Sequence, residues 1–159
     1  MTIRGNARNY HKRFAFLVEI EEVGFAGFQS CSELAAEVAV VEQYEGGALT
    51  PDKSPGRATV DDLTLERGAT QDNDLYAWWL DVVNISANSG LATPFLKREV
   101  EIVQLERDRT ILARWQINGA WPRRFVAGSW DNDADENVIE TMVLAIDSFD
   151  LIPSGGGEA

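Results

Sequence analysis

Residues 57–83, RATVDDLTLERGATQDNDLYAWWLDVV, predict a strand, a turn and a helix in direct succession. The first ten of them alternate in character with a period near two, which is typical of a half-buried strand. Arg67 and Gly68 break this pattern, and Thr70 can then cap a helix by accepting a hydrogen bond from a free backbone N–H. The helix is expected over residues 71–83, because apolar side chains recur at i, i+3, i+4, i+7 and i+8 on one face, namely Leu75, Trp78, Trp79, Val82 and Val83.

The tryptophans of this chain are predicted to be structural. Trp78 and Trp79 are adjacent on the apolar stripe, and each can bury a large area if the helix packs against a sheet. Trp115 and Trp121, which fall on a later predicted strand, are assigned to the same structural core. Stacking of a ligand on the paired tryptophans is the alternative interpretation.

Composition limits the class of protein. The chain has 159 residues with 45% hydrophobic and 25% charged side chains, which suits one globular domain over residues 1–159. We expect residues 1–11 to form an N-terminal arm and residues 154–159 a flexible tail. The net charge of −12 argues against nucleic acid or an anionic membrane as a partner held by simple attraction.

Nothing in the sequence predicts export or membrane insertion. The single cysteine, Cys31, cannot form an internal disulfide. No apolar run reaches the length of a transmembrane helix, and the first residues lack the apolar centre of a signal peptide. We therefore expect no membrane insertion by this chain and assembly in a cytoplasm.

The remaining segments predict a mainly β protein. Residues 33–43, ELAAEVAVVEQ, have good helix formers, but their alternation favours a strand over a helix. With this segment, about seven strands are expected, in addition to the helix at about 71–83. The prediction is an α+β, mainly antiparallel β-barrel or sandwich with one flanking α-helix. The other predicted strands cover residues 12–20, 23–30, 57–66, 100–105, 110–126 with a bend at GAWP, and 138–149.

A long loop is predicted between two of these strands. Residues 44–56, YEGGALTPDKSPG, hold three glycines and two prolines. The strands that end at Gln43 and begin at Arg57 are predicted to pair as a long hairpin. A protruding loop of this length is uncommon unless it has a function or is disordered.

The residues that catalysis requires are missing. The only histidine, His11, lies in the polar N-terminal arm, far in sequence from Cys31, so Ser/His/Asp, Cys/His and zinc sites lack their components. Asp61 and Asp62 are a candidate carboxylate pair for a hydrolase, but neighbours on a strand point to opposite faces. We therefore expect no enzyme activity, no catalytic, cofactor-binding or metal-binding residues, and no cofactor.

The order of several short motifs resembles a known family, the inner tail-tube proteins of contractile phage tails and of extracellular contractile injection systems. The most specific part of the resemblance is LTLERGAT before DLYAWW, followed by ARWQINGAWP. The segment CSEL at residues 31–34, where the family usually has a Ser-Gly-Leu turn, leaves open whether the chain is a main tube, a variant ring or a tube-end adaptor. The resemblance covers residues 10–152 and also includes YHKRFAFLVEI with GFAGFQS, VVEQYEGG, SPG and VIETMVLAIDSFDLI.

The resemblance implies an Hcp-like structural protein without a cofactor. It implies hexameric rings that stack into a hollow tube inside a sheath, with sheath, baseplate or spike, and tube-terminator proteins as partners, and with DNA or a cargo protein in the lumen. Such a tube is part of a phage tail or of an injection particle that can be released from the cell. The long loop would contact the next ring through Tyr44, Glu45, Gly46, Gly47, Asp52, Lys53 and Ser54. The alternatives are a tube-end or baseplate adaptor ring and a monomeric β-barrel module that binds a ligand.

Overall fold

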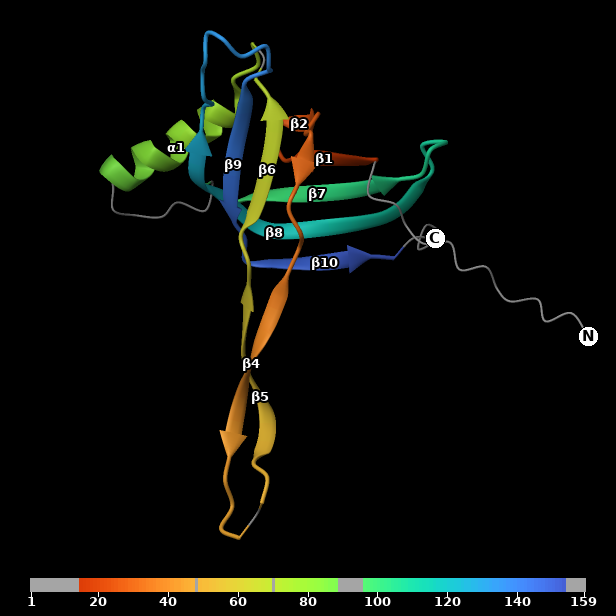
Figure 1. The fold of residues 1–159 in the computed structure, drawn as a ribbon, viewed down its shortest axis with the longest axis vertical. Helices are drawn as coiled ribbons and strands as arrows, with labels where there is room; N and C mark the ends of the chain where they lie inside the picture. The colour runs from red at the N-terminus through yellow and green to blue at the C-terminus, as the bar shows by residue number, and fades with distance from the viewer. Residues whose placement is uncertain (1–14, 48, 70, 89–95, 154–159) are drawn as a thin grey trace, which may run out of the picture.

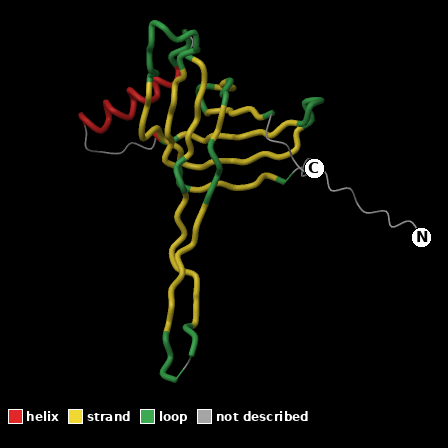
Figure 2. The backbone as a smooth tube through the Cα atoms, in the orientation of Figure 1, coloured by secondary structure: helices red, strands yellow, loops and turns green. Residues whose placement is uncertain are grey.

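The computed structural model describes residues 15–47, 49–69, 71–88 and 96–153, so Thr70, His11 and the predicted terminal segments lie outside the described residues. A body of strands and one helix carries a separate two-stranded arm (Figures 1 and 2). The helix is α1 (Asp74–Asn88). The strands are β1 (Phe16–Ile20), β2 (Gly24–Ala26), β3 (Ser30–Cys31), β4 (Ala36–Gln43), β5 (Asp52–Val60), β6 (Leu63–Gly68), β7 (Arg98–Leu105), β8 (Ile111–Val126), β9 (Ile139–Ala145) and β10 (Ser148–Ile152).

The body is an open, sandwich-like arrangement of antiparallel strands. Its strand order is β2-β1-β7-β8-β9-β6-β3, with β10 on the other edge of β8. The first part of β8 pairs with β7 and β10, whereas its last part pairs with β9, so this long strand joins two layers. In Figure 1, β7 and β10 run across the view while β6 and β9 run along the long axis. Among the described strands the path ends at β2 and β3 without closing, so of the predicted alternatives the sandwich applies and the closed barrel does not.

The bend predicted in the GAWP stretch is confirmed. Gly119 has a φ of 66°, a conformation that favours glycine, and the pairing of β8 with β9 shifts register between Pro122 and Arg124. Beyond this point β8 leaves the layer that contains β7 and enters the layer that contains β9.

The core lies between these layers and the helix. Alternation places Val18 and Ile20 of β1 on the buried side, as their spacing predicted, and it does the same for Leu63 and Leu65 of β6. The helix α1 packs against β8. The other fully buried apolar side chains in the described part of the chain are Leu75, Trp78, Val100, Ile117, Ala120, Pro122, Met142 and Leu144.

Two further sequence predictions are confirmed. The segment at residues 33–43 contains a strand, β4, rather than a helix. The segment around residues 100–118 forms the antiparallel β7–β8 hairpin, in which Arg109 adopts a φ of 66° within the turn.

The single strand predicted over residues 57–66 is wrong. The chain forms two strands, β5 and β6, that belong to different sheets. The break falls at Asp61 and Asp62, where the backbone N–H of Asp61 donates to the carbonyl oxygen of Ala35, and the side chain of Asp62 pairs with Arg123 at 2.8 Å. These contacts hold the point at which the arm ends and the body begins.

Arg67 and Gly68 do not break the strand as predicted, because they are its last two residues. The Arg67 guanidinium is buried, and its Nε donates to Glu140 Oε2 at 3.0 Å. Glu140 stands directly opposite Arg67 on β9. A buried arginine at a strand end is therefore explained by a charged partner on the next strand.

The helix is longer than predicted, and the last predicted strand is two strands. α1 continues five residues beyond Val83, because the first glycine or proline after it is Gly90. The strand expected over residues 138–149 is divided into β9 and β10. Between them the N–H of Asp147 donates to the carbonyl oxygen of Asn118, which starts β10 on the free edge of β8.

Candidate assembly surfaces

The β4–β5 hairpin forms an arm that projects from the body along the longest axis of the molecule (Figure 1). The two strands pair from Ala36 opposite Val60 to Gln43 opposite Asp52, with an irregularity between Val38 and Val40. Every residue of β4 is exposed. A two-stranded hairpin that lacks further packing is at best marginally stable in water, which makes this exposed arm a candidate assembly surface.

The loop at the tip of the arm is shorter than predicted. Asp52, Lys53 and Ser54 belong to β5 and stand opposite Gln43, Glu42 and Val41. Pro55 also lies within β5, which is possible because a strand at a sheet edge can lack one donor. The connecting loop is therefore residues 44–51.

The structure brings the seven predicted stacking residues together on the outer part of the arm. The Tyr44 hydroxyl donates to Glu42 Oε2 at 3.1 Å, and the Ser54 hydroxyl donates to the carbonyl oxygen of Val41 at 3.5 Å. Gly47 has a φ of 91°, which favours glycine at this point of the turn. Glu45 and Gly46 lie beside it and are exposed.

The arm has one apolar face. Because side chains alternate along a strand, Ala36, Val38 and Val40 point to the same side of β4. The register places Val60 and Ala58 opposite the first two of them. Val60 is half-buried, but Val38 and Val40 on this apolar face are exposed to solvent, and an exposed apolar strand is typical of an interaction site.

A second candidate surface is the free edge of the body. Among the described strands, β10 pairs only with β8, and Leu151 on it is exposed. The same layer carries a polar row across four strands, in which register aligns Glu19 with Glu101, Glu101 with Gln116, and Gln116 with Asp150. The Arg114 side chain offsets part of this acidic charge through a 3.1 Å contact with Glu101.

The tryptophans assigned to the core do not form one cluster. Trp78 is buried, and its Nε1 donates to the carbonyl oxygen of Leu96 at 3.1 Å. Trp79 is half-buried and packs against the core. Trp115 and Trp121, both on β8, are also only half-buried, and Trp115 makes an edge contact with Phe149.

Arg98 fixes the helix to the sheet, a role that the sequence pattern did not predict. Its guanidinium lies 5.0 Å from the centroid of the Trp78 ring, within the range of a cation–π interaction. Its Nη2 is 3.4 Å from Glu22 Oε2 and 3.7 Å from Asp81 Oδ2. No short spacing connects an arginine at residue 98 to residues 22, 78 and 81, so only the fold reveals this contact.

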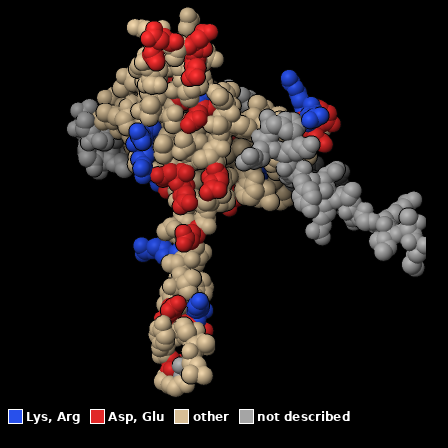
Figure 3. All heavy atoms as spheres, viewed as in Figure 1, with Lys and Arg blue, Asp and Glu red and all other residues tan. Residues whose placement is uncertain are grey.

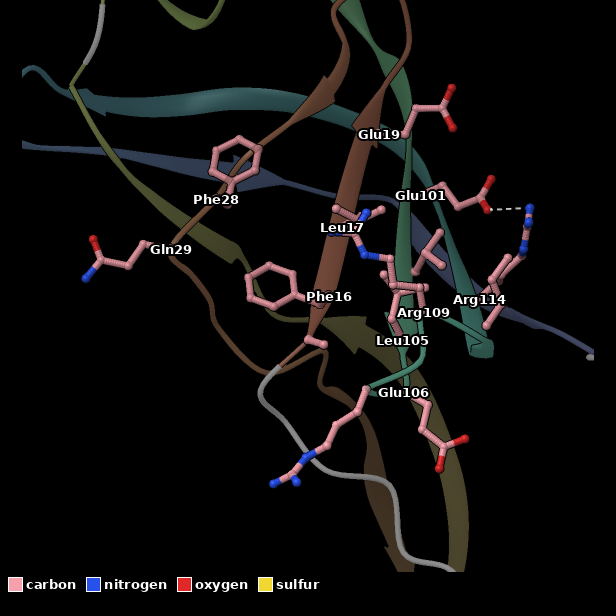
Figure 4. Close-up of a pocket in the computed structure, with 14 residues that line it drawn as sticks. Phe16, Leu17, Glu19, Phe28, Gln29, Glu101, Leu105, Glu106, Arg109 and Arg114 are labelled. Atoms are coloured by element: carbon pink, nitrogen blue, oxygen red, sulfur yellow. Dashed lines mark hydrogen bonds and ion pairs between the residues drawn. The ribbon is translucent and has the colours of Figure 1, made fainter.

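A groove of about 740 Å³ lies between β1 and the β7–β8 turn (Figure 4). Phe16, Leu17 and Phe28 give it apolar walls, and its titratable side chains are glutamates and arginines. The groove therefore presents no pair of nucleophile and base. In the described part of the chain, no three His, Cys, Asp or Glu side chains are grouped as metal ligands.

Titration properties also fail to indicate catalysis. Burial raises the pKa of the Cys31 thiol from 9.0 to about 11, so the nucleophilic thiolate is scarce at neutral pH. Hydrogen bonds from Thr110 lower the pKa of Asp108 in the β7–β8 turn. A side-chain hydrogen bond with Asp72 raises the pKa of Asp74 at the start of α1.

Comparison with a protein family identifies the class. The model of the T4-like virus tail tube protein gp19 family matches residues 12–150. The chain therefore belongs to this family of structural tail tube proteins, which are not enzymes. A search of curated protein sequences finds no significant match. No described helix is long and apolar enough to span a bilayer.

Several solved structures share the fold. A chain in the sheath–tube complex of the extracellular contractile injection system PVC, in its extended state, is 19% identical with a TM-score of 0.78, covering 93% of this chain and 95% of that chain. A chain in the tube-terminating cap of the anti-feeding prophage is 22% identical with a TM-score of 0.79, covering 97% and 100%. Hcp1 from Flavobacterium johnsoniae is 13% identical with a TM-score of 0.59, covering 91% and 97%.

Proposed function

We propose that this protein forms rings of six copies that stack into the hollow inner tube of a contractile phage tail or of a tail-like injection particle. Family membership supports a tube protein, and similarity of fold to chains of a sheath–tube complex and a tube cap supports a contractile particle. The observation that carries the proposal is the β4–β5 arm, whose strands lie outside the core with an apolar face in solvent.

In a stack of rings, another copy would supply the surface that covers the apolar face of the arm. The arm extends along the longest axis of the molecule, so a copy placed further along that axis can cover its apolar face (Figure 1). The residues from Tyr44 to Gly47 and from Asp52 to Ser54 then form the outer part of the contact between rings. Because Val38 is only 49% and Val40 62% exposed in a single copy, covering them would supply roughly 1–1.5 kcal/mol each, about half the value for a fully exposed side chain.

Ring closure would use the other surface. β10 presents an unpaired edge at one side of its layer, and β1 has pairing to β2 only over Val18–Ile20 at the other side. Pairing between these edges of neighbouring copies would extend one layer around the ring. The polar row from Glu19 to Asp150 would then face the lumen, where acidic side chains let DNA pass without adhering or hold a cargo protein loosely.

The partners of such a tube are a sheath, a baseplate or spike, and a tube terminator, and we propose assembly in the cytoplasm before the particle acts. An adaptor ring at the end of the tube is the second candidate. It is favoured by similarity to a chain in the anti-feeding prophage baseplate, with a TM-score of 0.77 at 20% identity.

Size-exclusion chromatography with light scattering, followed by negative-stain microscopy, tests the proposal. We expect hexamers at low protein concentration and stacked rings with a central channel at high concentration or when baseplate is added. A strict monomer under all conditions, with sheath and baseplate present, would contradict it. Single rings that bind the end of a tube but never stack would instead indicate the adaptor.

A further inference from the structure

The end of the molecule opposite the arm carries an exposed tryptophan. The loop between β8 and β9 lies at this end, and the arm lies at the other end of the longest axis (Figure 1). Trp130 in this loop is 73% exposed, the highest exposure among the described tryptophans. Tryptophan is among the residues that contribute most to binding where it becomes buried in an interface. An exposed indole at this position is therefore available for a partner.

The loop after Trp130 is acidic and unpaired. Asp131, Asp133, Asp135 and Glu136 are all exposed, and none of them forms an ion pair with the described residues. Figure 3 shows acidic side chains gathered at this end of the molecule, with others along the arm. The loop holds no lysine or arginine, so its surface around Trp130 is negative.

The arm has matching apolar groups but the same sign of charge. Val40, Tyr44 and Leu49 are exposed on it, at the far end from Trp130. Its charged residues are four acids and two bases, namely Glu37, Glu42, Glu45, Asp52, Lys53 and Arg57. Lys53 stands opposite Glu42 in the register, so part of the positive charge is offset within the arm itself.

We propose that Trp130 and the β8–β9 loop receive the arm of a second copy, in a contact that is apolar at its centre and like-charged around it. This inference rests on the proposed stacking of rings. Repeated head-to-tail stacking along one axis brings opposite ends of the molecule together, and such heterologous contacts are open-ended. The arm and the Trp130 loop are the two opposite ends.

The charges make the contact sensitive to salt. Four carboxylates on the loop meet an arm with an excess of two negative charges, so the two surfaces repel each other at low ionic strength. The screening length falls from about 10 Å at 0.1 M salt to about 3 Å at 1 M. Rings therefore stack poorly at low salt, and screening or a baseplate that pre-orders the first ring overcomes the repulsion.

Three variants of the full chain test this contact, together with the wild-type protein. Trp130→Ala removes the apolar centre. D133N/D135N/E136Q removes three loop charges whose side chains make no hydrogen bonds within the described residues, and E33Q/D61N/E106Q removes three exposed charges elsewhere as a matched control. Stack length is measured by sedimentation and negative-stain microscopy at about 0.05 M and about 0.5 M NaCl, a range over which screening changes strongly, and thermal unfolding establishes that each variant folds.

We expect wild-type stacks to lengthen at high salt, and the loop variant to stack already at low salt. The control variant should behave like the wild type, and Trp130→Ala should form rings that do not stack at either salt concentration. Stacks of Trp130→Ala with wild-type length, or equal gains from the loop and control variants, would overturn the inference and leave ring stacking itself intact. Failure of the wild-type protein to form rings would overturn the proposed function as well.

Discussion

β4 and β6 are both antiparallel strands with alternating sequences, but they have opposite environments. In β6, LTLERG, Leu63, Leu65 and Arg67 are buried and the residues between them are half-buried. In β4, AEVAVVEQ, every residue is exposed, including the valines at 38, 40 and 41. The apolar side chains of β6 are buried in the core beside its partner strand β9, whereas β4 pairs only with β5 and its valines stay exposed.

This difference distinguishes residues that stabilise the fold of a single copy from residues that are available to contact a partner. Apolar side chains on β6 contribute to folding of a single copy, since they are buried within it. Apolar side chains on β4 are exposed in a single copy, so they would become buried only in the proposed contact with another copy. Variants of the body should therefore change the free energy of unfolding, and variants of the arm should change assembly.

The largest effect is expected from shortening the arm. Replacing residues 42–53 with Asn-Gly joins Val41 to Ser54, which stand opposite each other, through a two-residue hairpin turn. We expect ring stacking to be abolished, while the free energy of unfolding changes by less than about 1 kcal/mol because no core residue is removed. Negative-stain microscopy and urea unfolding measure the two effects, and tubes of normal length would show that rings contact each other elsewhere.

Truncation of the two tryptophans on α1 should show how the loss of stability depends on the burial of the side chain that is removed. Trp78→Ala removes a buried side chain with a hydrogen bond to Leu96, and we expect a loss of about 3–5 kcal/mol in the free energy of unfolding. Trp79→Ala is the matched control, because Trp79 is half-buried, and a loss of about 1 kcal/mol is expected. Urea unfolding followed by circular dichroism gives both values; equal losses would mean that Trp79 is buried as completely as Trp78.

A third and smaller difference in the free energy of unfolding is expected between loss of the buried Arg67–Glu140 ion pair and loss of an exposed ion pair. Glu140→Ala leaves the Arg67 guanidinium buried without its carboxylate, and we expect a loss of about 3 kcal/mol. The value lies at the low end for such changes because Arg67 Nη2 still donates to the carbonyl oxygen of Asp72 at 3.1 Å. Lys97→Ala breaks the exposed contact with Asp147 and should cost about 0–1 kcal/mol. Chemical denaturation of the two variants compares them, and similar losses would contradict the assigned burial.

Local patterns predicted individual strands better than the connections between them. Alternation correctly gave β1, β4 and the β7–β8 hairpin, because each depends on side chains two residues apart. The division of residues 57–66 between two sheets could not be read from alternation, which continues through Asp61 and Asp62 with the same period. That break depends on the distant contacts of Ala35 and Arg123.

The candidate surfaces were only partly predictable. Glycine and proline content marked the arm, but pairing by backbone hydrogen bonds extended β5 to Asp52 despite Pro55 and Gly56. Trp130 received no role in the sequence prediction, since its exposure follows from where the β8–β9 loop lies. Its place in the acidic segment WDNDADE was the available signal, but a single tryptophan beside acids has no specific spacing.

The smallest expected effect concerns the Cys31 thiol, whose reactivity reports how stably the chain is folded between the body and the arm. It lies in β3, opposite Leu65 of β6, a few residues before β4 begins. Burial raises its pKa to about 11, so the folded protein should hold about 100-fold less thiolate near pH 8 than the unfolded chain with a pKa of 9.0. Because the thiolate is the reactive form, alkylation by iodoacetamide should be slower by a similar factor in native protein than in urea.

The raised pKa of Cys31 also means that the folded state loses stability relative to the unfolded state as pH rises from about 9 toward 11, since the unfolded state releases its proton first. Labelling rates from mass spectrometry at several pH values measure this effect. Native labelling as fast as that in urea would show that β3 opens readily, so that the boundary of the stable body lies at β6 rather than at the base of the arm.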